Sequence, residues 1–224
     1  MEIQTDKLNN DSHWQSLSSD WSSDKETFPM PWGKLMMWIF LLSDTFIFSI
    51  FLTGYMNVRM SATEPWPNTS EVFALTIFGQ HMPLILIAIM TFVLITSSGT
   101  MALAVNYGYQ GQRKKTMWLI IATALLGASF VGMQVFEWSK LIHEGVRPWA
   151  NPFGAAQFGS SFFMITGFHG LHVSAGVIYL SVIANRVRKG HYQDKSSHPV
   201  EIVGLYWHFV DLVWVFIFAF FYLW

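Results

Sequence analysis

Five long apolar segments dominate the hydrophobic pattern of the chain, and short polar breaks separate them. The segments cover residues 35–55, 82–105, 116–136, 158–183 and 202–224. At about 1.5 Å per residue, helices of this length cross the roughly 30 Å hydrocarbon core of a bilayer. The breaks contain Gly, Pro and Asn, which mark turns. The pattern predicts an all-α integral membrane bundle of five transmembrane helices.

The first 31 residues differ from the rest of the chain in composition. They are rich in Ser and Asp and contain six acidic residues against two lysines. A segment with so few apolar residues cannot bury enough surface to fold alone. It also has neither the basic start nor the short apolar core of a secretory signal. We expect a disordered, cytoplasmic polar tail over residues 1–31 and one membrane domain over residues 32–224.

The overall composition is that of a membrane protein and excludes several classes of function. Hydrophobic residues make up 52% of the chain and charged residues only 12%, too few to cover a soluble surface. The net charge of −1 argues against a nucleic-acid partner, which requires a basic patch. The lack of cysteine excludes disulfides, iron–sulfur clusters and cysteine nucleophiles.

The positions of the basic residues predict the orientation in the membrane. Loops on the cytoplasmic side carry an excess of Lys and Arg. Ten basic residues lie on the side of the N-terminus: Lys7, Lys25, Lys34, Arg113, Lys114, Lys115, Arg186, Arg188, Lys189 and Lys195. Only Arg59, Lys140 and Arg147 lie on the opposite side. The split predicts a cytoplasmic N-terminus and a C-terminus on the outside.

Polar side chains interrupt the apolar segments at a few positions: Asp44, His169, His172, His208 and Asp211. Counted along the helices, Asp44, His172 and Asp211 lie at one level, about 14 to 16 Å from the cytoplasmic end. His169 lies deeper and His208 is shallower, while Glu137 lies at the outer end of the third segment. Such groups are costly in lipid, so we expect them to face other helices.

These polar groups have both a structural and a functional interpretation. For His172 and Asp211, the structural one is an interhelical hydrogen bond, which adds only a fraction of a kcal/mol in a membrane. A carboxyl near the membrane centre, such as Asp44, more often marks a path for protons or ions or a lipid headgroup site. We therefore favour a functional role for Asp44.

The depths and spacing of the same residues argue against a metal site on this chain. A haem with two axial histidines needs them at one depth, but His172 and His208 differ by about 7 Å along their helices. A di-iron site needs about four carboxylates with Glu-x-x-His spacing, which is absent. A membrane haem or di-iron enzyme stays open as the alternative function. A small transporter is disfavoured because no apolar segment is broken at its middle by Gly or Pro.

Two stripes of small residues recur at intervals of four along the third and fourth segments. One consists of Ala124, Ala128 and Gly132, and the other consists of Thr166, Gly170 and Ser174. Small residues at this spacing allow close approach of two helices in a membrane. Both stripes therefore predict helix contacts.

Three short motifs carry a resemblance to a known family. They are Gly-Phe-His-Gly-Leu-His-Val at residues 167–173, Tyr-Trp-His-Phe-Val-Asp at residues 206–211 and Leu-Ser-Asp-Thr-Phe at residues 42–46. The first two, one per helix and in that order, resemble subunit III of the haem-copper terminal oxidases, which include cytochrome c and quinol oxidases, and the third resembles the acidic membrane helix of the same family. The resemblance covers residues 32–224. Five helices correspond to the form found in many bacteria, which implies a plasma membrane protein.

The resemblance implies a non-catalytic subunit beside catalytic subunit I, with haem and copper in partner subunits and no metal on this chain. It implies bound phospholipid in a helix cleft, and support of proton uptake and sustained turnover. Asp44 matches the buried carboxylate of the family, which is often glutamate, and Arg186 matches an arginine that contacts lipid phosphate. The remaining matched positions are the carboxyls Glu137 and Asp211 and the lipid-binding or interhelical residues His169, His172, Glu201 and His208.

Overall fold

The computed structural model describes residues 31–73, 75–77, 80–82, 84–190 and 198–223, so the predicted tail lies outside the described residues except for Pro31. Five described helices are long and apolar enough to cross a membrane, which confirms the predicted fold class. They are α2 (Trp32–Ser61), α4 (Ile85–Tyr109), α5 (Arg113–His143), α6 (Ala156–Lys189) and α7 (His198–Phe218), the last continuing as the π-helix η1 (Ala219–Leu223). All but α4 begin before the apolar segment that predicts them, because polar residues at their ends continue the helical hydrogen bonding.

A short hairpin precedes α4, at the point where the sequence pattern predicts a helix. Strand β1 (Leu75–Ile77) pairs antiparallel with β2 (Gln80–Met82). The second span, predicted from about Met82, becomes helical three residues later, because a residue that precedes proline avoids the helical region. The helix begins at Ile85 instead, after Leu84 in the left-handed conformation with φ of 61°.

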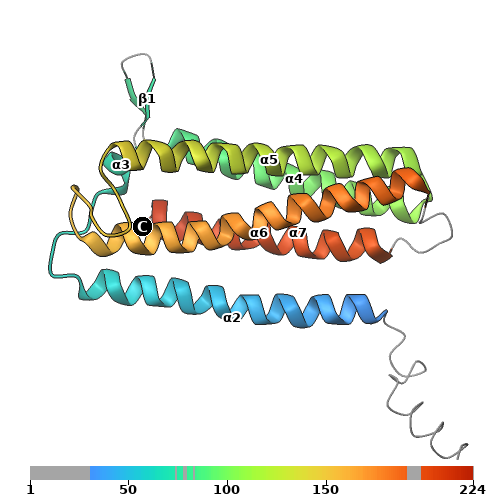
Figure 1. The fold of residues 1–224 in the computed structure, drawn as a ribbon, viewed down its shortest axis with the longest axis horizontal. Coiled ribbons are helices and arrows are strands. Elements are labelled where there is room, and N and C mark those ends of the chain that lie inside the picture. The colour runs from blue at the N-terminus through green and yellow to red at the C-terminus, as the bar shows by residue number, and fades with distance from the viewer. Residues whose placement is uncertain (1–30, 74, 78–79, 83, 191–197, 224) are drawn as a thin grey trace, which may run out of the picture. The chain divides into compact units, whose positions relative to one another are not determined.

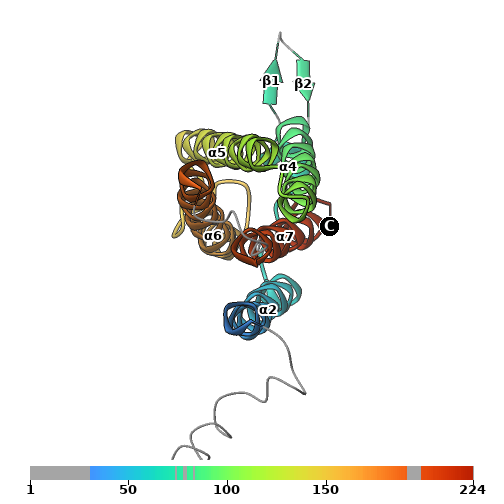
Figure 2. The same ribbon diagram turned by 90° about the vertical axis from the view of Figure 1, so that its right-hand side faces the viewer.

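The chain divides into two compact units, Met1–Met36 and Met37–Trp224, which we describe separately. In the described part of the first, the amides of Lys34 and Leu35 donate to the carbonyl of Pro31 and form the first turn of α2. In the second, α4, α5, α6 and α7 form a four-helix bundle in which each helix packs against two neighbours (Figures 1 and 2).

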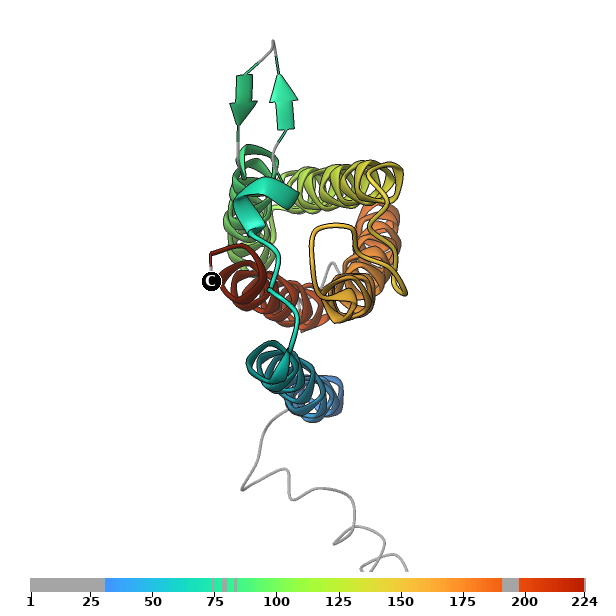
Figure 3. The same ribbon diagram turned by 90° about the vertical axis from the view of Figure 1, so that its left-hand side faces the viewer.

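The short helix α3 (Thr69–Val72) closes one end of the bundle beside η1 (Figure 3). The hydroxyl of Thr69 donates to the carbonyl of Tyr222 over 3.4 Å, and the rings of Phe73 and Tyr222 lie 4.5 Å apart. The loop before α6 is fixed at the same end, where the amide of Ala155 donates to the carbonyl of Pro65 over 3.3 Å. These contacts hold the outer loops against the bundle.

Trp207 fills the centre of the bundle, and glycines make room for it. Its side chain is fully buried, and Nε1 donates to the hydroxyl of Ser97 over 2.9 Å. A Cβ added at Gly176 would lie 2.9 Å from the indole, and one added at Gly127 would overlap it. The absence of side chains at these two positions lets α5 and α6 approach α7 closely.

The small-residue stripe on α5 is only partly confirmed as a helix contact. Ala124 is buried, but Gly132 is exposed, and a Cβ there would meet none of the described atoms within 4 Å. Residues four apart advance about 400° around a helix, so a stripe at intervals of four drifts about 40° with each step. The drift carries Gly132 away from the core, and Gly127 makes the close contact instead.

Because ten basic residues lie on one side of the membrane helices and three on the other, we predict a cytoplasmic N-terminus and a C-terminus outside. This orientation can be tested with a reporter. Alkaline phosphatase, which is active only outside the cytoplasm, is expected to be active when fused after the last residue of the chain. The same reporter is expected to be silent when inserted between α4 and α5. The measurement is reporter activity in whole cells, normalised to the amount of fusion protein. Activity only in the α4–α5 fusion would reverse the orientation.

Candidate functional site

Asp44 on α2 and His172 on α6 form a buried polar contact between helices. His172 Nε2 lies 3.2 Å from Asp44 Oδ2, and the Asp44 side chain is 6% exposed. This is an ion-pair distance, although the two groups are not aligned for a hydrogen bond. The predicted common depth of these two residues therefore corresponds to a direct contact. Asp211, which is predicted at the same depth, does not join this contact, because its side chain lies beside Ser98 of α4.

The hydrogen bonding of His172 restricts where a proton can lie in this pair. Its Nδ1 is 2.8 Å from the carbonyl oxygen of Phe168, which can only accept, so Nδ1 carries a hydrogen. In the neutral ring, Nε2 is then a free acceptor that faces the Asp44 carboxyl. Asp44 and His172 thus form a polar pair between α2 and α6, with the ring nitrogen Nε2 facing the carboxyl.

Aromatic rings surround the Asp44–His172 pair. Phe48 of α2 lies edge-on to His172 at 5.5 Å, and Phe168 lies 4.7 Å from it. Tyr206 of α7 donates its hydroxyl to the backbone carbonyl of His172 over 2.9 Å. The rings cover part of the pair, of which the His172 side chain stays 15% exposed, and the tyrosine joins α7 to the same turn of α6.

His208 and Asp211 of α7 meet α4 rather than α6. The hydroxyl of Ser98 is 2.7 Å from His208 Nδ1 and also lies beside the Asp211 carboxyl. Asp211 is buried, and the His208 side chain is half-buried. The motif at residues 206–211 therefore serves two contacts, with Tyr206 facing α6 and the two later polar residues facing α4.

His169 lies inside the four-helix bundle, where Phe48 of α2 meets its ring edge-on at 6.4 Å. It is 1% exposed, stacks on Trp214 at 5.4 Å and meets Phe130 edge-on at 5.9 Å. Neither ring nitrogen has a hydrogen-bond partner within the described part of the chain. Positions three apart differ by about 60° around a helix, so His169 points into the bundle core while His172 points at Asp44.

Glu137 is buried near the outer end of α5, where it links this helix to η1. Gln134 Nε2 donates to Oε2 of Glu137 over 3.1 Å, and the Tyr222 hydroxyl is 3.2 and 3.3 Å from the two carboxyl oxygens. It lies near the C-terminal end of α5, which the sequence predicts to be the outer end. The two donors satisfy the carboxyl locally, so Glu137 and the Asp44–His172 pair form separate clusters.

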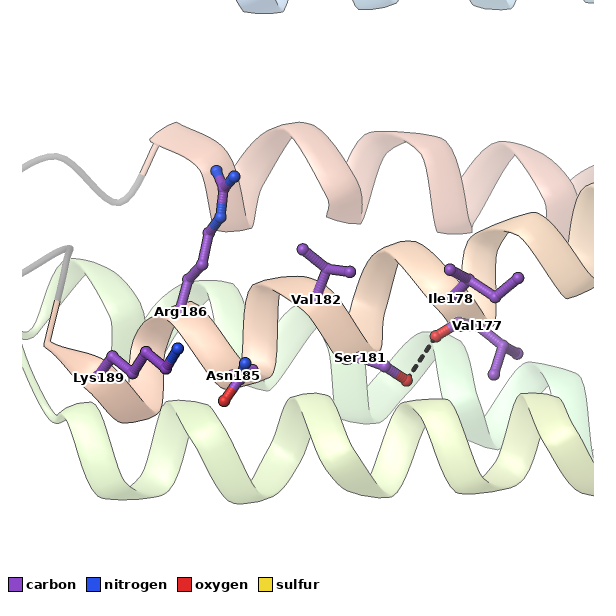
Figure 4. Close-up of a pocket in the computed structure, with 7 residues that line it drawn as sticks. All are labelled: Val177, Ile178, Ser181, Val182, Asn185, Arg186 and Lys189. Carbon is purple, nitrogen blue, oxygen red and sulfur yellow. Dashed lines mark hydrogen bonds between the residues drawn. The ribbon is translucent and has the colours of Figure 1, made fainter.

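Two predicted residues remain, Glu201 near one end of α7 and Arg186 near one end of α6. The distribution of Lys and Arg along the chain predicts that both ends face the cytoplasm. The hydroxyl of Tyr109 donates to Oε2 of Glu201 over 2.5 Å, which ties α4 to α7. Arg186 and Lys189 border a recess of about 510 Å³ on α6, with Val177, Ile178 and Val182 toward the middle of the helix (Figure 4). The recess combines cationic groups at the helix end with an apolar wall.

The predicted polar residues do not converge on one point. Among the described residues, no three His, Asp or Glu side chains lie close enough together to hold a metal ion. His169, His172 and His208 each have different neighbours, namely Trp214, Asp44 and Ser98. The described residues therefore form several separate polar contacts between helices.

Three contributing residues escaped the sequence prediction: Ser98, Gln134 and Tyr222. Gln134 lies one turn before Glu137, and this i, i+3 spacing was a signal that could have identified it. Ser98 and Tyr222 contact residues far along the chain. No local spacing predicts such pairs, because they depend on how the helices are rotated against each other.

The sequence was compared with known proteins after the site had been described. The sequence model of the family described as "Cytochrome c oxidase subunit III" matches residues 19–224. The "Probable quinol oxidase subunit 3" of Staphylococcus aureus (strain USA300) is 34% identical over 196 residues, or 88% of this chain and 90% of the relative. The protein of the same description from Staphylococcus saprophyticus is 33% identical over 187 residues, or 84% of this chain and 86% of the relative.

Proposed function

This chain belongs to the cytochrome c oxidase subunit III family, and from that premise we propose that it is the non-catalytic third subunit of a proton-translocating haem-copper terminal oxidase. It is a multi-pass protein of the bacterial plasma membrane and part of a multi-subunit oxidase complex. The reaction of that complex is the reduction of oxygen to water, with haem and copper in the partner subunits. The match of the family model over residues 19–224 carries this proposal.

We propose further that the Asp44–His172 pair supports proton uptake by the neighbouring catalytic subunit I. The supporting observation is a carboxyl and an imidazole at 3.2 Å in the apolar layer, held so that one proton can reside on either. Release of this proton leaves a carboxylate beside a neutral imidazole, and uptake of a second proton leaves a carboxylic acid beside an imidazolium. In either state the single charge keeps a polar neighbour, which lowers the cost of carrying it inside the membrane.

Lipid binding is the second part of the proposed role, and it is assigned to the α6 recess. Its cationic border, formed by Arg186 and Lys189, suits the phosphate of a phospholipid headgroup. The wall of Val177, Ile178 and Val182 suits an acyl chain. The headgroup charges would then lie at the cytoplasmic surface, where the side chains of Arg and Lys are most favourable in a membrane protein.

The proposed function is tested by isolating the chain with its native partners. A tagged chain is expected to co-purify with a haem-containing subunit and to consume oxygen as part of that complex. When the chain is separated from its partners, iron and copper are expected to fall far below one atom per chain. Recovery of stoichiometric iron with the separated chain would favour a haem or di-iron enzyme in its own right, and recovery of the chain without any haem protein would contradict the proposed function.

A further inference from the structure

The polar contact between α4 and α7 contains two ionisable groups joined by one hydroxyl. The Ser98 hydroxyl lies 2.7 Å from His208 Nδ1 and also lies beside the Asp211 carboxyl. The neighbouring Ser97 hydroxyl donates to the carbonyl of Leu94 within α4 over 2.7 Å, whereas Ser98 directs its hydroxyl across to α7. Because a hydroxyl can donate one hydrogen bond and accept another, Ser98 can connect the imidazole to the carboxyl.

Asp211 is the enclosed end of this cluster. It is 7% exposed, and neither of its carboxyl oxygens has a partner at hydrogen-bond geometry within the described part of the chain. A carboxylate at this position is costly, because burial removes it from water and the nearby Ser98 hydroxyl carries no charge. A proton that reaches Asp211 is therefore held as part of a neutral carboxylic acid.

His208 is the open end of the same cluster. It is half-buried and lines a groove of about 920 Å³ between α2 and α7, where it is the one ionisable side chain among the described residues that form the lining. It lies three residues, or about 4.5 Å, closer than Asp211 to the start of α7, the end predicted to face the cytoplasm. Since Nδ1 faces Ser98, Nε2 is the ring nitrogen that remains for proton exchange.

The other ionisable groups around this part of α7 belong to separate contacts. On α6, His169 lies in the bundle core and His172 faces Asp44 of α2. α4 contains no Asp, Glu, Lys, Arg or His between Ile85 and Tyr109. Burial and the Ser98 hydroxyl, rather than a neighbouring charge, therefore control where a proton lies in the cluster.

We infer that His208, Ser98 and Asp211 form a proton relay that stores one proton on Asp211. Before uptake, Nδ1–H of His208 donates to the Ser98 oxygen, and the Ser98 hydroxyl donates to the Asp211 carboxylate. A proton then binds Nε2, Nδ1 passes its proton to the Ser98 oxygen, and Ser98 passes its own proton to the carboxylate. Asp211 ends as a carboxylic acid and His208 as a neutral ring with its hydrogen on Nε2.

Uptake of one proton by the relay therefore moves the ring hydrogen of His208 from Nδ1 to Nε2, although the ring is neutral before and after. The use of this relay by the oxidase rests on the proposed function, which assigns proton uptake to the complex. The relay itself is a property of this chain and can be tested without its partners.

Nitrogen magnetic resonance of the full chain in lipid bilayers tests the relay, because ring nitrogens with and without hydrogen have different chemical shifts. The chain is labelled with ¹⁵N-histidine, and the His208 signals are identified by their loss in His208→Asn. As the pH falls, the hydrogen is expected to move from Nδ1 to Nε2 before the ring becomes an imidazolium. If Nε2 instead gains a proton while Nδ1 keeps its own, the proton stays on histidine and the relay is overturned.

Three variants identify the parts of the relay. Ser98→Ala removes the connecting hydroxyl and Asp211→Asn removes the group that accepts the proton, so both are expected to abolish the movement of hydrogen between the ring nitrogens. Ser98→Thr keeps a hydroxyl and is expected to retain it. Persistence of the movement in Ser98→Ala or Asp211→Asn would overturn the inference, as would its loss in Ser98→Thr in a chain that still folds.

The matched control is Ser129→Ala. This hydroxyl is exposed on α5 and donates to the carbonyl of Leu126 over 2.7 Å, so its removal is expected to leave the His208 signals unchanged. A negative result for the relay would leave the proposed function intact as long as the chain still co-purifies with the haem-containing subunit.

Discussion

Gly127→Leu is expected to lower the free energy of unfolding of the isolated subunit by about 1 to 3 kcal/mol, the usual range for overpacking a close-packed core. Even a Cβ at this position would overlap the Trp207 ring and lie 2.9 Å from Val177 Cγ2. The indole cannot move aside easily, because Gly176 faces its other side and Ser97 accepts its hydrogen bond. The measurement is unfolding by sodium dodecyl sulfate in mixed micelles, followed by circular dichroism.

Gly132→Leu is the matched control for Gly127→Leu. It lies five residues away on the same helix, at an exposed position where a Cβ meets no described atom within 4 Å. Both substitutions gain about 0.8 to 1 kcal/mol of helix propensity, so the difference between them isolates the contact with Trp207. Equal stability of the two variants would show that the bundle adjusts without strain and that Trp207 does not set the helix spacing.

Asp44→Asn is expected to yield an assembled oxidase with a normal haem spectrum and oxygen consumption that is slower or declines sooner during turnover. The carboxamide is similar in shape to the carboxyl and can donate to His172 Nε2, so α2 keeps its polar contact with α6. It cannot exchange a proton, so the pair loses its second protonation state. The measurement is oxygen consumption against time, with complexes matched for haem content.

Two further variants separate proton exchange from helix packing and from lipid retention. Asp44→Ala removes the carboxyl that faces His172 Nε2, which is expected to lower the stability of the α2–α6 contact as well as the activity. Arg186→Ala removes a cation from the α6 recess and is expected to share the early decline only if lost lipid is the cause. A wild-type rate and lifetime in Asp44→Asn would reduce Asp44 to a packing residue.

The polar residues show how much of the site could be predicted. A position along a helix fixes depth, so the common level of Asp44 and His172 was available from the sequence. Their contact was not, because it depends on the rotation of α2 and α6 about their axes. Asp211 was predicted at the same level, yet it faces Ser98 of α4, since α7 turns that side toward a different neighbour.

The small residues show the same limit. The sequence pointed to Ala124, Ala128 and Gly132 as a contact stripe, but the contact that shapes the core belongs to Gly127. A repeat of four identifies a row on an isolated helix, whereas the crossing angle of the neighbours decides which row is buried. A stripe of small residues therefore identifies a helix contact only when its neighbours in the tertiary structure are known.

The sequence by itself determined the number and approximate extent of the membrane helices, because transfer into lipid depends on the length and apolarity of each continuous segment. Its motifs also identified the family, which the comparison confirmed. Only the tertiary structure decided that His172 meets Asp44 while His169 enters the bundle, and that grooves lie along α6 and between α2 and α7. The physical reason is that hydropathy acts on each segment separately, whereas polar contacts and grooves arise from the mutual rotation and tilt of several helices.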